Sequence, residues 1–193
     1  MGVRYDIENQ HFVFDFKHDG TEDIISLTGK GYEVTAFGKC FHYGYEFGDD
    51  VEGSVRSAFI KHLKFPKRPL KEDPDLTQFI QRAIDGLHKK INLYNYEIVV
   101  SINSSRRVNR YMRLYTYRFA QPRIMNSENL TCEQIQDKDV EKINASNALV
   151  IDDIATSGST LNEVMRSLSV LNENNNITIF SLIGRKDLMA ETA

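Results

Sequence analysis

Apolar residues in the middle of the chain recur three and four positions apart, which is the period of a helix with one buried face. The clearest helix is predicted to begin at Asp73 and Pro74, because aspartate is a favoured N-cap and proline is tolerated at the first helical position. Another helix is predicted over residues 51–63, before a proline-containing connection. The apolar face of the first helix contains six residues: Leu76, Phe79, Ile80, Ala83, Ile84 and Leu87.

Short apolar runs rich in Val and Ile are bounded by polar turns, which is typical of buried strands. They cover residues 97–102, 148–151 and 177–183. A helical pattern over residues 159–172 separates the last two runs, and such a strand–helix–strand unit implies a right-handed crossover in a parallel sheet. We therefore expect an α/β fold with an open, mostly parallel sheet and flanking helices.

The first 70 residues follow a different pattern. Phe12, Phe14 and Phe16 alternate with other residues, which predicts short strands. We therefore expect a β-rich segment over residues 1–70 and a separate core over residues 71–193. Residues 126–147 are polar and poorly periodic, so we expect a mobile loop there.

Composition narrows the class of protein. A chain of 193 residues, 41% of them hydrophobic, suits one compact domain, and its net charge of −3 does not resemble that of a nucleic-acid binder. Cys40 and Cys132 lack the spacing of metal ligands or of a disulfide framework, so we expect no protein-held metal and a reducing, cytoplasmic setting. No stretch is long and apolar enough to suggest a membrane span.

The candidate chemistry follows the apolar run at residues 148–151. Asp152 and Asp153 come at the expected carboxyl end of that strand, where open parallel sheets bind ligands. Ionised carboxylates only accept hydrogen bonds, so the pair suits the vicinal hydroxyls of a sugar. The next loop offers hydroxyls, a glycine and the free N–H groups of a helix start, all of which suit a phosphate: Thr156, Ser157, Gly158, Ser159 and Thr160.

Residues 149–161, LVIDDIATSGSTL, resemble the phosphoribosyl-pyrophosphate signature of type I phosphoribosyltransferases. That signature has two apolar residues, Asp-Asp, two spacers, Thr, a spacer, Gly, Ser or Thr, and Thr. The resemblance implies the core fold of that family, with Asp152 and Asp153 on the ribose hydroxyls and residues 156–160 on the 5′-phosphate. The alternatives are a solvated strand end with a ligand-free helix cap, or a receiver- or phosphatase-type magnesium site, which would not explain the Ser/Thr/Gly run.

A second loop follows residues 97–102 and contains Ser104, Ser105, Arg106 and Arg107. Its position resembles that of the family's pyrophosphate-binding loop, and a guanidinium group can bind phosphate through two hydrogen bonds. The loop also weakly resembles the Arg-Arg segment of competence-associated phosphoribosyltransferase-like proteins. The alternative is that both arginines are exposed cations at a helix start.

Arginines and aromatic residues are interleaved over residues 108–123, a mixture that also occurs in nucleic-acid-binding segments. We favour packing over nucleic-acid binding, with the arginines exposed to solvent or to the same anionic ligand. The residues expected to pack against the sheet are Tyr111, Leu114, Tyr115 and Phe119.

The family resemblance implies an enzyme that transfers the phosphoribosyl group of phosphoribosyl pyrophosphate to a nucleobase or similar nitrogen acceptor. Pyrophosphate would be released, and Mg²⁺ would arrive bound to the phosphoribosyl pyrophosphate. Residues 126–147 contain no recognisable catalytic-loop motif, so no catalytic residue is assigned, and a non-catalytic sensor of phosphoribosyl pyrophosphate or a nucleotide is the alternative. A hood that selects the acceptor would come from residues 1–70, and a homodimer is compatible with this interpretation.

Overall fold

The computed structural model describes residues 2–6, 8, 11–15, 24–26, 38–43, 46–47, 53–102, 106–120, 147–155 and 177–184. The strands are β1 (Gly2–Asp6), β2 (His11–Asp15), β3 (Ile24–Ser26), β4 (Gly38–Tyr43), β5 (Glu46–Phe47), β6 (Ile98–Ser101), β7 (Ala148–Ala155) and β8 (Ile177–Gly184). The α-helices are α1 (Gly53–Lys64), α2 (Pro74–Ile91) and α3 (Arg107–Thr116), and short 3-10 helices cover Leu70–Glu72 and Leu93–Asn95.

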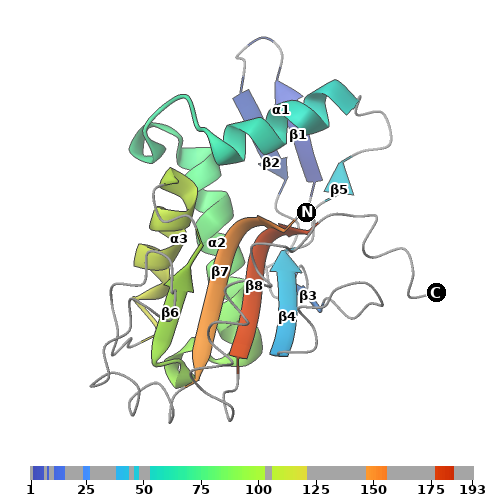
Figure 1. The fold of residues 1–193 in the computed structure, drawn as a ribbon. Coiled ribbons are helices and arrows are strands. Elements are labelled where there is room, and N and C mark those ends of the chain that lie inside the picture. The colour runs from blue at the N-terminus through green and yellow to red at the C-terminus, as the bar shows by residue number, and fades with distance from the viewer. Residues whose placement is uncertain are drawn as a thin grey trace, which may run out of the picture.

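The larger sheet has five strands in the order β3-β4-β8-β7-β6. Four of these strands, β4, β8, β7 and β6, are parallel to one another. The edge strand β3 is antiparallel to β4. Figure 1 shows that the carboxyl ends of the parallel strands point toward α1. The chain therefore has the mixed α/β class and the mostly parallel sheet expected from its sequence. The helix expected at residues 159–172 and the loop at residues 126–146 lie outside the described residues.

The N-terminal segment contributes to both sheets. Strands β1, β2 and β5 form a small three-stranded sheet beside α1 (Figure 1), while β3 and β4 extend the large sheet next to β8. Phe12 and Phe14 of β2 both contact the ring of Phe59 in α1. The first 70 residues are β-rich, as expected, but part of this segment completes the main sheet. The boundary near residue 70 and the role of a hood stay predictions.

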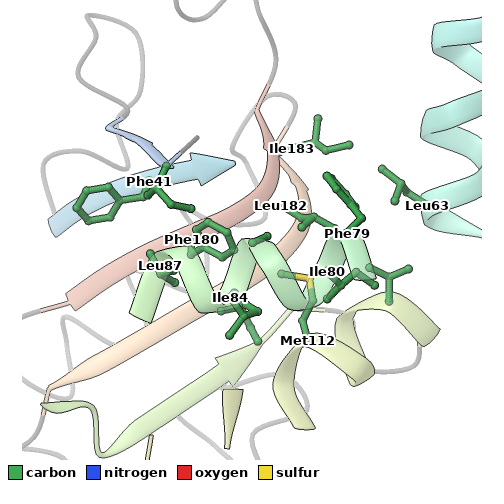
Figure 2. Packing of buried hydrophobic residues seen from close by; sticks show 14 of the residues in the cluster. Phe41, Leu63, Phe79, Ile80, Ile84, Leu87, Met112, Phe180, Leu182 and Ile183 are labelled. Atoms are coloured by element: carbon green, nitrogen blue, oxygen red, sulfur yellow. The ribbon is translucent and has the colours of Figure 1, made fainter. Parts of the chain in front are cut away.

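Helix α2 is the main support of the large sheet. All six residues of its expected apolar face are completely buried, and they share one core with residues of β8, α1 and α3. Figure 2 shows Ile84 and Leu87 of α2 near Phe180 of β8, with Met112 of α3 next to Ile80. Since β4 lies next to β8, its Phe41 joins the same cluster. The helical period in the sequence thus marks the face that holds the sheet.

Asp73 caps α2 in the way its sequence position predicts. Its Oδ1 accepts a hydrogen bond from the backbone N–H of Leu76 at 3.1 Å, and its Oδ2 lies 2.9 Å from Nε2 of His62 in α1. Burial alone would raise the pKa of this carboxyl, but the hydrogen bonds with His62 and Leu76 outweigh it, so the pKa is lowered. The ionised cap therefore joins α1 to the start of α2.

Replacement of Asp73 with alanine is expected to lower the free energy of unfolding by about 1–2 kcal/mol, because the helix loses its cap and the link to His62. Urea denaturation of Asp73→Ala measures the loss. Thr77→Val is a useful comparison, since Thr77 bonds to the carbonyl of Leu70 but does not cap the helix N-terminus. A stability of Asp73→Ala equal to that of the parent would contradict the capping role.

Candidate functional site

The aspartate pair lies inside β7 and not beyond its end, which corrects the expectation from sequence. The expected strand stopped at Ile151, but pairing with β8 continues through Asp152, opposite Ser181, to Ala155. The apolar pattern was misleading because two polar residues interrupt it before Ile154. As strand residues, both aspartates are buried, with 6% of Asp152 and none of Asp153 exposed.

One segment at the start of α3 contacts both aspartates, through Arg106 and Asn109. The register of β7 with β8 stays regular at the pair, since Asp152 lies opposite Ser181 and Ile154 lies opposite Ile183. The same short stretch of α3 therefore meets two neighbouring carboxyl groups of one strand.

Arg106 forms an ion pair with Asp153. Its Nη1 lies 3.0 Å from Oδ1 and 3.1 Å from Oδ2 of the aspartate, and 28% of the arginine side chain is exposed. Oδ1 of Asp153 also accepts from the backbone N–H of Ile154 at 2.8 Å. Arg106 is the N-cap residue of α3, where a cation is unfavourable beside the helix dipole. The ion pair with the buried carboxylate offsets this unfavourable interaction.

Asn109 contacts the other aspartate. Its Nδ2 lies 3.2 Å from Oδ1 of Asp152 and also donates to the carbonyl oxygen of Ile102, just after β6. The backbone N–H of Asp153 donates to the same Oδ1 at 2.9 Å. The sequence interpretation missed Asn109. An available signal was its place three residues before Met112, on the helix face that is buried.

The two aspartates differ in their electrostatic setting. Burial and the adjacent Asp153 together raise the pKa of the Asp152 carboxyl from its ordinary value of 3.8 to about 8, with burial the larger cause, although donation from Asn109 acts in the opposite direction. A carboxyl with that pKa is mostly protonated near neutral pH. The ligand-free site therefore pairs a neutral Asp152 with an Asp153 that is held by Arg106.

The remaining expected site residues are only partly described. Arg107 is exposed, and its Nη1 donates to the carbonyl oxygens of Pro66 and Arg68, each at 3.3 Å, so it anchors the connection between α1 and α2. The other expected ligand-binding residues lie outside the described part of the chain: Ser104, Ser105, Thr156, Ser157, Gly158, Ser159 and Thr160.

The residues expected to pack α3 against the sheet do not form its buried face. Tyr111, Tyr115 and Phe119 are partly buried and pack against the core, but Leu114 is 52% exposed. The fully buried positions of the helix are Val108, Asn109, Met112 and Thr116, so its inner face is rotated from the expected one. The tyrosines lie along the edge of that face: the hydroxyl of Tyr115 donates to Asp85 of α2, and that of Tyr111 accepts from Gln81 of α2.

Within the described ranges, no three or more His, Cys, Asp or Glu residues are grouped so that they could hold a metal ion. None of the described helices has the length and apolar character needed to cross a membrane. No protein-family model and no curated protein sequence matches this chain.

Proposed function

We propose that the chain binds phosphoribosyl pyrophosphate at Asp152, Asp153 and the loop that follows them, and transfers its phosphoribosyl group to a nitrogen acceptor. The proposal rests on one contact: Arg106, which follows β6, forms an ion pair with Asp153 of the adjacent parallel strand β7. Ligands of open parallel sheets bind beyond such carboxyl ends. A phosphosugar suits both groups, because its ribose hydroxyls can donate to the carboxylates of β7 and its phosphate groups can pair with the cation that follows β6.

Arg106 is suited to bind a second anionic group of that ligand. Of the nitrogen atoms of Arg106, Nη1 is the one that donates to Asp153. A guanidinium group has five N–H donors in a planar arrangement. The remaining donors suit pyrophosphate oxygens. The ion pair thus leaves the arginine able to contact the aspartate and the pyrophosphate together.

The proposed chemistry needs alignment and charge stabilisation. An acceptor nitrogen attacks the anomeric carbon as the bond to pyrophosphate breaks, and positive charge develops on the ribose ring. Asp152 and Asp153 would fix the ring through its hydroxyls, and Arg106 would stabilise the departing pyrophosphate. Mg²⁺ enters as part of the substrate, where it neutralises charge on the pyrophosphate.

A panel of nucleobases with pyrophosphate detection tests the proposal. Pyrophosphate release that requires both phosphoribosyl pyrophosphate and one of the added bases supports the transferase. Tight binding of phosphoribosyl pyrophosphate without release of pyrophosphate would favour the non-catalytic sensor. That alternative stays open because residues 126–147 contain no recognisable catalytic-loop motif. If calorimetric titration shows binding of neither phosphoribosyl pyrophosphate nor a nucleotide, both functions are rejected.

Asp152→Asn and Asp153→Asn are each expected to lower the affinity for phosphoribosyl pyrophosphate by roughly ten- to a hundredfold, because an asparagine cannot supply a carboxylate acceptor for the ribose hydroxyls. Asp152 reaches that carboxylate form by losing its proton when the ligand binds. Calorimetric titration measures the affinity of each variant. Inorganic phosphate serves as the control ligand, because it occupies the proposed phosphate loop without reaching the ribose position. Loss of the negative charge of Asp153 favours phosphate binding, whereas replacement of the protonated Asp152 leaves it nearly unchanged. A parallel loss of affinity for both ligands would argue against the ribose-hydroxyl role.

A further inference from the structure

Asn109 places an amide in an otherwise apolar part of α3. Val108, Asn109 and Met112 are all completely buried. Asparagine is a poor residue for a helix, and a buried amide is costly unless its hydrogen bonds are made. Packing alone therefore does not explain an asparagine at this position.

The amide joins the ends of two neighbouring strands. Its Nδ2 donates to the carbonyl oxygen of Ile102, which follows β6, and to Oδ1 of Asp152 in β7. Both partners are oxygen acceptors, so the NH₂ end of the amide must face them, and both of its N–H groups are used. The hydroxyl of Ser101 in β6 donates to the backbone carbonyl of Asn109 at 3.3 Å, which ties the helix to the same strand end.

The other end of the amide has a different environment. Oδ1 of Asn109 is buried, and no described residue donates to it. If Asn109 served only to satisfy its own hydrogen bonds, both the oxygen and the NH₂ group of its amide would have partners. The asymmetry indicates that this position is used for donation to Ile102 and Asp152.

We propose that Asn109 is a positioning residue of the phosphosugar site, whose amide fixes the Asp152 carboxylate relative to the end of β6 so that it meets the ribose hydroxyls. This inference rests on the proposed function. Arg106 precedes Asn109 by less than one helical turn and holds Asp153. The start of α3 therefore orients both aspartates, one by charge and one by an amide.

The role of Asn109 can be tested through the ionisation of Asp152. A donor favours the ionised carboxylate, so loss of the donor raises the pH at which Asp152 ionises. Among the described residues, the charged group beside Asp152 is Asp153, which is paired with Arg106 of α3. On the neighbouring strands, Ser181 lies opposite Asp152 and Ser101 lies opposite Ile151, and both are uncharged.

Helix α1 also packs against β7. Its charged residues are the same in the parent and in the Asn109 variants, so the comparison of these proteins isolates the amide. The basic residues in the second half of that helix are Lys61, His62 and Lys64.

Asn109→Leu removes the donor at nearly constant volume. Its affinity for phosphoribosyl pyrophosphate is expected to be about tenfold lower than that of the parent near pH 7, to approach the parent value at higher pH, and to show a midpoint raised by about one pH unit. Calorimetric titration over the range from about pH 6 to about pH 9 measures these changes. Because the same ligand is used throughout, ionisation of its own phosphates cancels in the comparison.

Thr116→Val is the matched control. Thr116 lies on the same helix, is completely buried, and donates to the carbonyl oxygen of Met112 at 2.8 Å. This variant also loses a buried hydrogen bond but leaves Asp152 untouched. It is expected to lose stability without a change in the midpoint of the pH profile.

Titration of the Asp152 carboxyl carbon by NMR in the ligand-free protein separates this inference from the proposed function. Asn109→Leu should again raise the midpoint by about one pH unit. Should the parent fail to bind phosphoribosyl pyrophosphate, the proposed function falls, and this titration alone decides whether Asn109 controls the carboxyl. An unchanged midpoint in the variant overturns the positioning role. If Asn109→Leu does not fold, Asn109→Ala should show a smaller shift in the same direction, because water can replace part of the donation.

Discussion

Arg106→Leu is expected to lower the free energy of unfolding by about 3 kcal/mol near pH 7, one of the two largest effects that we anticipate. The substitution leaves the completely buried carboxylate of Asp153 without the cation that lies 3.0 Å from it. An unpaired buried charge costs far more than the loss of an exposed ion pair. Chemical denaturation of the parent and the variant measures the difference.

Two further variants show whether the buried charge is the cause. Asp153→Asn in the Arg106→Leu background removes the charge and should recover most of the lost stability. Arg107→Leu changes the neighbouring arginine, which donates only to the carbonyl oxygens of Pro66 and Arg68 among the described residues, and should cost less than about 1 kcal/mol. Equal losses for Arg106→Leu and Arg107→Leu would refute the energetic importance of the ion pair.

Asp152→Asn is expected to stabilise the ligand-free protein, increasingly so as the pH rises. The folded-state pKa of Asp152 is about 8, above the ordinary value of 3.8, so the folded chain retains a proton that the unfolded chain has lost. Stability from this group is complete below the unfolded pKa and is lost as the pH rises toward the folded one. The asparagine, which resembles the protonated acid, avoids that loss.

The stability difference between Asp152→Asn and the parent should therefore widen by up to about 1.4 kcal/mol per pH unit between about pH 5 and about pH 8. Urea denaturation at several pH values measures the difference. The asparagine at the same position should weaken binding of phosphoribosyl pyrophosphate, so stability and binding would change in opposite directions. Parallel pH profiles for the two proteins would show that Asp152 does not titrate as the structure indicates.

These two expectations give the aspartate pair a physical interpretation. A buried strand that carried apolar residues at positions 152 and 153 would avoid the burial of two carboxyl groups. The chain instead offsets the cost with Arg106, with Asn109 and, for Asp152, with a retained proton. Such perturbed groups are common at functional sites, and this agrees with a ligand that replaces some of these interactions.

The sequence by itself determined the elements that depend on local pattern. The period of apolar residues located α2 and its buried face, and Asp73 with Pro74 located its start. Short apolar runs located β6 and β8 to within one or two residues. The family resemblance assigned Arg106 and the aspartate pair to different groups of one ligand, but it predicted no contact between them.

Only the tertiary structure decided which distant segments meet and what environment each side chain has. The pairing of β4 with β8 joins residues more than 130 positions apart, and no local period encodes such a pairing. The continuation of β7 through Asp152 and Asp153, the ion pair of Asp153 with Arg106, and the bond from Asn109 to Asp152 likewise follow from packing of α3 on the strand ends. Protonation of Asp152 depends on those contacts and on burial, because a pKa reflects the surroundings of a group in three dimensions and not its neighbours in sequence.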